Sequence, residues 1–299
     1  MDRNRLIRDI PPTSAAGAAS SAGRLTASVV AGELTRLTPR DRLLLDLLDQ
    51  HKTFTTEQFV DLAFGSIGRA RNRLNTLHTR DILDRFRHYQ RPGSQSWRWT
   101  LGPVGAAIIA ATSGATLPRP SAVRDATARL AMSPTLAHLL TANGFFVALT
   151  GHARTHYGVR LARWWNEARC REAVGAVVRP DGHGVWQVAG RAVPFWVEAD
   201  LGTETLSRVA GKLDGYGALP PARAYPVLFW LATGARELNL HAYLTRAGVP
   251  DGLTVATAAA DDAAELGGPA GPVWRVAGRG GRVNLADLIP SGDGARWDA

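Results

Sequence analysis

An apolar run that ends in two acidic residues constrains the fold of this 299-residue chain more than any other feature. The run covers positions 192–199 and predicts a strand that closes on Glu198 and Asp200. Side chains two positions apart on a strand point to one face, so these two carboxylates share a face of the sheet. Asp181 lies upstream on a Pro-Asp-Gly turn, and Lys212 lies downstream on a predicted helix. Carboxylates beside a cation suit a divalent metal and a phosphate, because Mg²⁺ prefers hard oxygen ligands.

Lys212 carries further information because lysine is almost absent from the chain. Of thirty-five basic residues only Lys52 and Lys212 are lysines. A coding bias of this strength replaces interchangeable lysines by arginine, so a retained lysine invites a chemical explanation. An ammonium is a compact charge whose pKa can shift, whereas a guanidinium stays charged. Chance survival is the alternative, and it suffices for Lys52, which lies in an ordinary loop.

Charge and composition limit the classes of function. The net charge is +9 and the pI is about 10.6, which favours a polyanionic partner and most simply double-stranded DNA. A hydrophobic content of 45% allows real cores, and the length suits about two domains. The one cysteine, Cys170, excludes an internal disulfide framework and fits a reducing compartment. No apolar run is long enough to cross a bilayer and no signal peptide is evident, so we expect a cytoplasmic protein without membrane contact.

The region 34–111 predicts three helices followed by a β-hairpin. Thr38 caps the first helix ahead of Pro39, Thr55 or Thr56 caps the second, and the third runs over 66–79. Alternating patterns over 82–89 and 96–101 flank an Arg-Pro-Gly-Ser turn and predict two paired strands. This order is typical of a winged helix-turn-helix domain, in which the third helix enters the major groove and the hairpin contacts the backbone.

Basic residues concentrate in the same segment and make it the predicted DNA-binding surface. The alternative is that these arginines only solvate a helical face, but helix, hairpin and basic excess coincide here. The expected contacts are Arg69, Arg71, Asn72, Arg73, Asn75, Arg85, Arg87, Arg91 and Arg98.

The remaining pattern predicts a second domain over 134–258. A helix near 134–150 precedes strands near 160–167, 175–179 with a continuation past the turn, 192–199 and 225–232. A helix over 203–217 separates the last two strands, which gives an α/β layer with a mixed sheet. We expect a disordered lead-in over 1–33, a linker over 112–133 and a mostly flexible region over 259–299. The fold class is therefore α+β.

The acidic pattern in this element order resembles the PD-(D/E)XK restriction-endonuclease-like superfamily. The chain departs from the motif because Asp200 stands where the motif lysine belongs, and Lys212 on the next helix resembles a relocated version. The whole arrangement is similar to the actinobacterial replication-relaxation family over about residues 35–245. The resemblance rests on Leu-Thr-Pro-Arg-Asp from Leu37, on the 74–81 stretch, on Val-Glu-Ala-Asp-Leu-Gly-Thr at 197–203 and on Lys-Leu-Asp-x-Tyr from Lys212. MobC-type relaxases of mobilisable plasmids are also similar.

The resemblance implies a protein that nicks, or helps to nick, supercoiled plasmid or integrative-element DNA at an origin. Asp181 and Glu198 would then be the principal ligands of Mg²⁺ or Mn²⁺, with Asp200 a third ligand or an outer-sphere partner. Lys212 would hold the scissile phosphate or help to activate water, and Glu167 could supply another carboxylate. A homodimer is one option for the assembly. A solvated strand end beside an ordinary Pro-Asp-Gly turn is the alternative interpretation of the cluster.

Two other functions compete with this one. A tyrosine relaxase needs a His-hydrophobe-His strand, which the sequence lacks. His152 and His156 lie four positions apart on a helix, but without further ligands they are typical of a polar surface, and His183 is expected to be exposed on its turn. A winged-helix regulator would use a non-catalytic nuclease-like domain for dimerisation or partner docking, and it would not need Glu198, Asp200 and Lys212 together.

Overall fold

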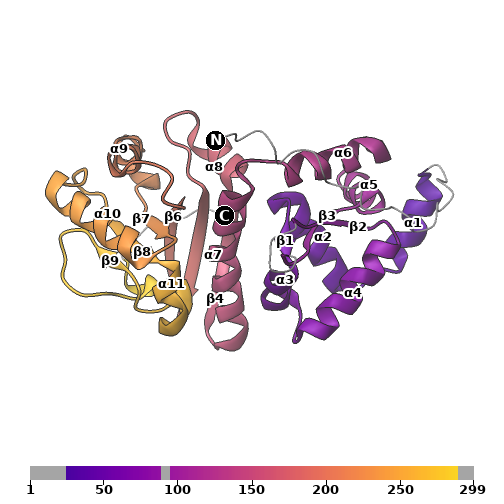
Figure 1. Ribbon diagram of the computed structural model, residues 1–299, viewed down its shortest axis with the longest axis horizontal. Coiled ribbons are helices and arrows are strands. Elements are labelled where there is room, and N and C mark those ends of the chain that lie inside the picture. The colour runs from indigo at the N-terminus through magenta and orange to yellow at the C-terminus, as the bar shows by residue number, and fades with distance from the viewer. Residues whose placement is uncertain (1–24, 89–94, 289–299) are drawn as a thin grey trace, which may run out of the picture.

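The computed structural model describes residues 25–88 and 95–288 of the chain. Residues 1–24, 89–94 and 289–299 lie outside the described residues, and with them the predicted DNA contact Arg91. The described part is α+β, with a three-stranded sheet in its N-terminal half and a mixed six-stranded sheet in its C-terminal half (Figure 1). Within these residues no helix combines the length and apolar character that a membrane crossing requires.

The N-terminal half contains the three helices and the hairpin that the sequence predicts, in that order, together with further elements. Its helices and strands are α1 (Ala27–Thr35), α2 (Pro39–His51), β1 (Phe54–Thr55), α3 (Thr56–Ala63), α4 (Ile67–Thr79), β2 (Leu83–Phe86), β3 (Arg98–Leu101), α5 (Pro103–Thr112) and α6 (Pro120–Ala131). Thr38, Thr55 and Ser66 each accept a backbone hydrogen bond as the N-caps of α2, α3 and α4. β2 and β3 form an antiparallel hairpin, and β1 pairs with the outer edge of β3.

The C-terminal half surrounds the larger sheet. Its main elements are α7 (Leu136–Thr155), β4 (Val159–Asn166), α8 (Glu167–Val174), β5 (Gly182–Val188), β6 (Arg191–Asp200), α9 (Leu206–Gly217), β7 (Val227–Leu231), α10 (Gly234–Ala247), β8 (Val255–Ala259), α11 (Ala260–Ala263) and β9 (Arg275–Val276). Short 3-10 turns lie at Pro221–Arg223, Ala264–Leu266, Gly268–Ala270 and Leu285–Asp287. The sheet order is β4-β5-β6-β7-β8-β9, and only the pairs β6–β7 and β7–β8 are parallel.

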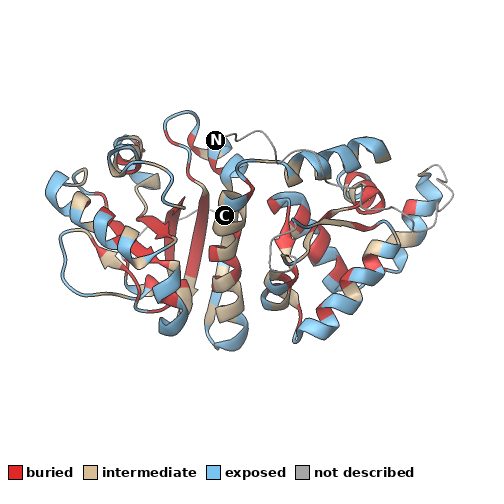
Figure 2. Ribbon diagram, viewed as in Figure 1, coloured by how far each residue is buried: buried red, intermediate tan, exposed pale blue. Residues whose placement is uncertain are grey.

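Helices cover both faces of this sheet. Odd-numbered side chains of β6, such as Phe195 and Val197, pack with Phe145 and Phe146 of α7. Even-numbered ones, such as Trp196, pack instead with α8, α9 and α10. Buried residues therefore run along the strands and the inward sides of the helices, while the outer sides are exposed (Figure 2).

Helix α7 also joins the two halves. The amide of Asn143 donates to the carbonyls of His51 and Thr53, at 3.0 Å each, inside a buried contact with the N-terminal half. The ring of His51 stacks on Trp164 of β4 with centroids 3.9 Å apart. Trp164 in turn stacks on Phe146, so one aromatic column crosses from the first half to the second.

Several predicted boundaries are wrong, and the cause is packing between distant segments. The predicted lead-in contains α1, because Thr26 caps it and its Glu33 pairs with Arg80 of the distant α4 segment. The predicted linker contains α6, which packs on α5. The predicted flexible region returns to the core, where Trp274 is fully buried. The predicted strand over 175–179 is a loop, and it directly follows helix α8.

Candidate functional site

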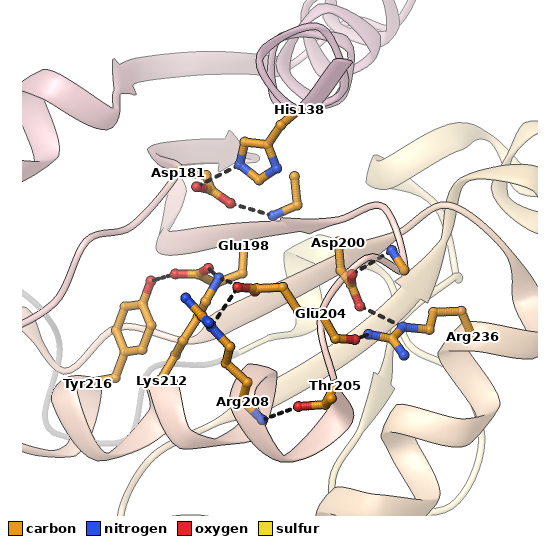
Figure 3. A network of polar contacts seen from close by, with 12 residues as sticks. His138, Asp181, Glu198, Asp200, Glu204, Thr205, Arg208, Lys212, Tyr216 and Arg236 are labelled. Carbon is orange, nitrogen blue, oxygen red and sulfur yellow. Dashed lines mark hydrogen bonds and ion pairs between the residues drawn. The ribbon is translucent and has the colours of Figure 1, made fainter. Parts of the chain in front are cut away.

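The predicted functional residues lie mainly in two places in the molecule, one acidic and one basic. The acidic site, defined by His138, Asp181, Glu198, Lys212 and Tyr216, lies where β6 ends against α9 and α7 (Figure 3). A basic groove lies between α4 and the β2–β3 hairpin. In both places, the spacing of residues along a strand or helix decides which side chains face the same side.

Glu198 is the centre of the acidic site. It lies near the end of β6, paired with Phe229 of β7, and only 1% of its surface is exposed. Lys212 Nζ donates to Glu198 Oε2 at 2.7 Å, and the hydroxyl of Tyr216 donates to Glu198 Oε1 at 2.6 Å. Residues four apart on a helix share a face, so α9 presents this ammonium and this hydroxyl together to the strand.

Asp181 reaches the same site from the neighbouring strand. It directly precedes β5, and its backbone N–H donates to the carbonyl of Val197 at 3.0 Å. Its Oδ2 accepts from the backbone N–H of Ala199 at 2.8 Å, which fixes the carboxylate against β6. His138, in the first turn of α7, places Nε2 2.9 Å from Asp181 Oδ1.

The site binds protons more tightly than its groups would in water. Burial, and then the charge of Asp181, raise the pKa of Glu198 to about 7. Burial alone would lower the pKa of Lys212, but the charge and hydrogen bond of Glu198 and the charges of Asp181 and Glu204 together outweigh it and raise that pKa. The hydrogen bond to Asp181 raises the pKa of His138. Asp181 contributes to all three shifts, and its negative charge, which favours protons, would equally favour a divalent cation.

Asp200 shares the face of Glu198, as the two-residue spacing predicts, but it has other partners. Its Oδ2 accepts from Arg236 Nε of α10 at 2.8 Å, and its Oδ1 accepts from the backbone N–H of Gly202 at 2.7 Å. Arg236 also donates to the carbonyl of Glu204, so Asp200 fixes the turn that leads into α9. Across residues 25–88 and 95–288, no three His, Cys, Asp or Glu side chains are gathered closely enough to hold a metal ion unaided.

The other candidate residues lie outside this network. Glu167 begins α8 as an exposed residue. The prediction of an exposed His183 is wrong: it is a strand residue, 1% exposed, with Nδ1 2.8 Å from the carbonyl oxygen of Phe195. Burial lowers its pKa to about 3, so it is a neutral core histidine. His152 and His156 stack face to face with centroids 3.8 Å apart. Parallel stacked rings direct their in-plane lone pairs side by side rather than toward one ion.

The basic groove is a hollow of about 320 Å³ between α4 and the hairpin. Its cations are held by aromatic rings: Arg85 lies 4.1 Å and Arg87 4.2 Å from the ring centre of Trp97. Arg85 also donates to Asn75 Oδ1 at 2.7 Å, which ties the hairpin to α4. Arg71 lines the same groove and is exposed.

The remaining predicted DNA contacts divide into exposed and structural residues. Arg69 and Asn72 are exposed on α4. Arg98 donates to Gln95 within the hairpin. Arg73 points inward: its Nε donates to Asp41 Oδ1 at 2.8 Å, and Asp41 is fully buried. We therefore correct the assignment of Arg73, which joins α4 to α2.

Sequence reasoning did not identify His138 or Tyr216 as members of the acidic site. The four-residue spacing of Lys212 and Tyr216 on one predicted helix was a usable signal for the tyrosine. His138 lies in an apolar helix more than forty residues before Asp181, and no local pattern connects the two.

The chain belongs to the replication-relaxation family. Residues 45–225 match the family model described as Replication-relaxation, which is more than half of the chain and contains the basic groove and the acidic site. No curated protein matches the chain. No solved structure matches it either.

Proposed function

We propose that this protein binds double-stranded DNA through a winged-helix surface and nicks, or helps to nick, one strand at a nuclease-like site. The target is supercoiled plasmid or mobile-element DNA at an origin, in keeping with a family described by replication and relaxation. The observation that carries the proposal is that Asp181 lies beside the Glu198–Lys212 ion pair at the end of β6, where its charge contributes to the raised pKa of both groups.

The DNA-binding part rests on the N-terminal half. Three helices followed by a hairpin match the element order of a winged helix, with α4 as the helix that enters the major groove. Arg71, Arg85 and Arg87 line the groove between α4 and the hairpin without any carboxylate partner among the described residues. Guanidinium groups in this condition suit phosphate contacts.

The residues of the acidic site fit a magnesium ion. In proteins this ion is held by one or two carboxylates, with waters and substrate phosphates completing its coordination. Asp181 and Glu198 supply two such carboxylates, and the charge of Asp181 contributes, after burial, to the raised pKa of Glu198, a repulsion that a cation would relieve. A bound Mg²⁺ or Mn²⁺ would polarise the phosphate and lower the pKa of a coordinated water.

The other residues of the acidic site orient these two carboxylates. Tyr216 and the backbone N–H of Ala199 fix Glu198 and Asp181 against rotation. Lys212 carries a charge on a flexible stem that could turn from Glu198 toward a phosphate oxygen. Asp200 holds Arg236, so we assign it a positioning role at the turn before α9.

The test is conversion of supercoiled plasmid carrying the cognate origin into open circles in the presence of Mg²⁺ or Mn²⁺. We expect Glu198→Gln and Asp181→Asn to reduce nicking about 100-fold or more while DNA binding persists, since they remove the charge but keep the shape. Asp200→Asn is the matched variant, with a smaller expected loss. Equal losses for all three variants would make Asp200 a metal ligand.

A second function is supported by one specific observation. Both carboxylates of the acidic site already have partners within the protein: Lys212 is a cation, and the raised pKa of His138 favours its protonated form beside Asp181. A winged-helix regulator with a non-catalytic nuclease-like domain for dimerisation or partner docking would have the same arrangement. Sequence-specific binding by the wild-type protein without nicking in either metal would favour the regulator.

A further inference from the structure

A cavity of about 330 Å³ opens beside the acidic site, and its shape and charge point to an occupant. It lies between α9 and the loop that precedes Asp181, with Glu198 and Lys212 at its inner end. Arg179 and Val177 of the loop line its outer part. Its volume falls in the range of cavities that bind small ligands.

Two glycines on α9 face this cavity for different reasons. A Cβ at position 215 would lie 2.8 Å from the carbonyl oxygen of Val177, so helix and loop could not pack as they do. A Cβ at position 211 would meet nothing within 4 Å. Packing therefore does not require Gly211, although glycine is unfavourable inside a helix. Because Gly211 lines the cavity and has no side chain, it leaves space that a larger residue would occupy.

The side chains around the opening suit a phosphate joined to an apolar group. Arg179 is exposed and forms no ion pair within the part of the chain that the structure describes. Lys212 stands at the inner end, with 33% of its side chain exposed. Val177 exposes 54% of its surface at the rim. Arg179 supplies a cation with no ion pair among the described residues, Lys212 supplies a second one if it turns from Glu198 and Glu204, and Val177 supplies an apolar rim. This lining suits one nucleotide unit, with its phosphate on Arg179 and its sugar on Val177.

We propose that this cavity receives a phosphate and sugar of the DNA strand held at the acidic site. The inference rests on the proposed function, because it places the strand that would be cut. A free nucleotide offers the same chemistry, so the strand is distinguished from it by experiment.

The test separates the cavity from the basic groove and from cleavage. Full-length protein carrying Arg71→Ala and Arg87→Ala has a weakened groove, so its remaining affinity for a short labelled single-stranded oligonucleotide, measured in EDTA by fluorescence anisotropy, reports the cavity. We expect Gly211→Leu, which fills the cavity, and Arg179→Gln, which removes its outer charge, each to weaken this binding about tenfold. Gly32→Leu is the matched control, because Gly32 also lies in a helix, on α1, with nothing within 4 Å of a Cβ.

The outcomes decide between strand, free nucleotide and neither. Unchanged oligonucleotide binding by Gly211→Leu overturns the proposal, and so does tighter binding of thymidine monophosphate than of the oligonucleotide. A melting temperature at or above that of wild type shows that each variant folds, and Gly211→Ala, which favours the helix, repeats the test with a smaller obstruction. Nicking plays no part in this readout, so a wild-type protein that fails to nick leaves the cavity result intact, and the reverse also holds.

Discussion

The charged side chains of the basic groove and of the acidic site are held in position by different kinds of partner. In the groove Arg85 and Arg87 are positioned by the ring of Trp97, and no described carboxylate lies within ion-pair distance of either, although Glu57 lines the same groove. In the acidic site Glu198 is buried, and Lys212 and Tyr216 take both of its oxygens. Groups held by aromatic rings remain available to a polyanion, whereas groups held by partner charges must exchange those partners before they bind anything else. The groove is therefore ready to bind, and the acidic site requires rearrangement.

The largest expected effect follows from removing the ammonium of the acidic site. Lys212→Met leaves Glu198 buried without its cation, and we expect a loss of about 3 kcal/mol in the free energy of unfolding. The pKa of Glu198 is raised to about 7 from 4.5, so the stabilising protonated form persists at low pH and is lost as pH rises through 7. The loss in urea unfolding should therefore be largest above pH 7 and shrink below it.

Glu204→Gln is the control for this prediction. Glu204 lies 3.5 Å from the same ammonium but is one-third exposed, so the variant should lose less than about 1 kcal/mol. A small, pH-independent loss in Lys212→Met would mean that the acidic site is not the buried, charge-coupled network we describe.

The contact between the two halves, where His51 stacks on Trp164, should make the stability of the protein sensitive to acid. His51 is 2% exposed against Trp164, and burial lowers its pKa to about 4 from 6.5. The unfolded chain binds the proton more tightly, so stability is full above pH 6.5 and is lost as pH falls toward 4. The shift corresponds to at most about 3 kcal/mol. His51→Phe keeps a stacked ring without the charge, so its advantage over wild type should grow as pH falls. A constant difference across this range would contradict the assignment.

The two regions also differ in what the sequence could predict. The cap Thr38 was assigned, and the next cap was narrowed to Thr55 or Thr56, from neighbouring residues alone, because an N-cap bonds within its own first turn. The shared face of Glu198 and Asp200 followed from the strand period in the same way. The hydrogen-bond and ion-pair partners of Glu198 and Asp200 could not be predicted from the sequence. Whether a carboxylate meets Lys212 or Arg236 depends on how α9 and α10 pack on the sheet, and such packing is not encoded in local spacing.

Failures elsewhere have the same physical origin. The 175–179 segment is apolar enough for a strand but lies against α9 as a loop, where Val177 contacts Gly215. Helix α1 lacks a strong periodic pattern and depends on the ion pair of Glu33 with Arg80. His138 enters the acidic site only because α7 packs on one face of the sheet with its first turn beside Asp181. Each feature depends on contacts between residues far apart in the chain.

Arg73 and Arg71 allow a matched comparison within one helix. Arg73→Ala leaves Asp41 fully buried with only its Thr38 partners, so we expect a loss of about 2 kcal/mol in the free energy of unfolding. Arg71→Ala, two positions earlier and exposed, should change stability by less than about 0.5 kcal/mol. Thermal or urea unfolding of the two variants checks both values. Equal stability of the two variants would show that the Asp41 pair contributes little.

The smallest change in stability should accompany a clear change in DNA binding. Each arginine that contacts a phosphate contributes about one unit to the slope of log affinity against log salt, so Arg71→Ala and Arg87→Ala should each reduce that slope by about 1. Arg129→Ala is the control, because Arg129 is exposed on α6 away from the groove. Arg87→Ala should also alter the emission of Trp97, since it removes the guanidinium held 4.2 Å from that ring. A slope that stays at the wild-type value in both variants would mean that the groove cations, although free of carboxylates, do not face the DNA, and the contrast with the acidic site would lose its functional meaning.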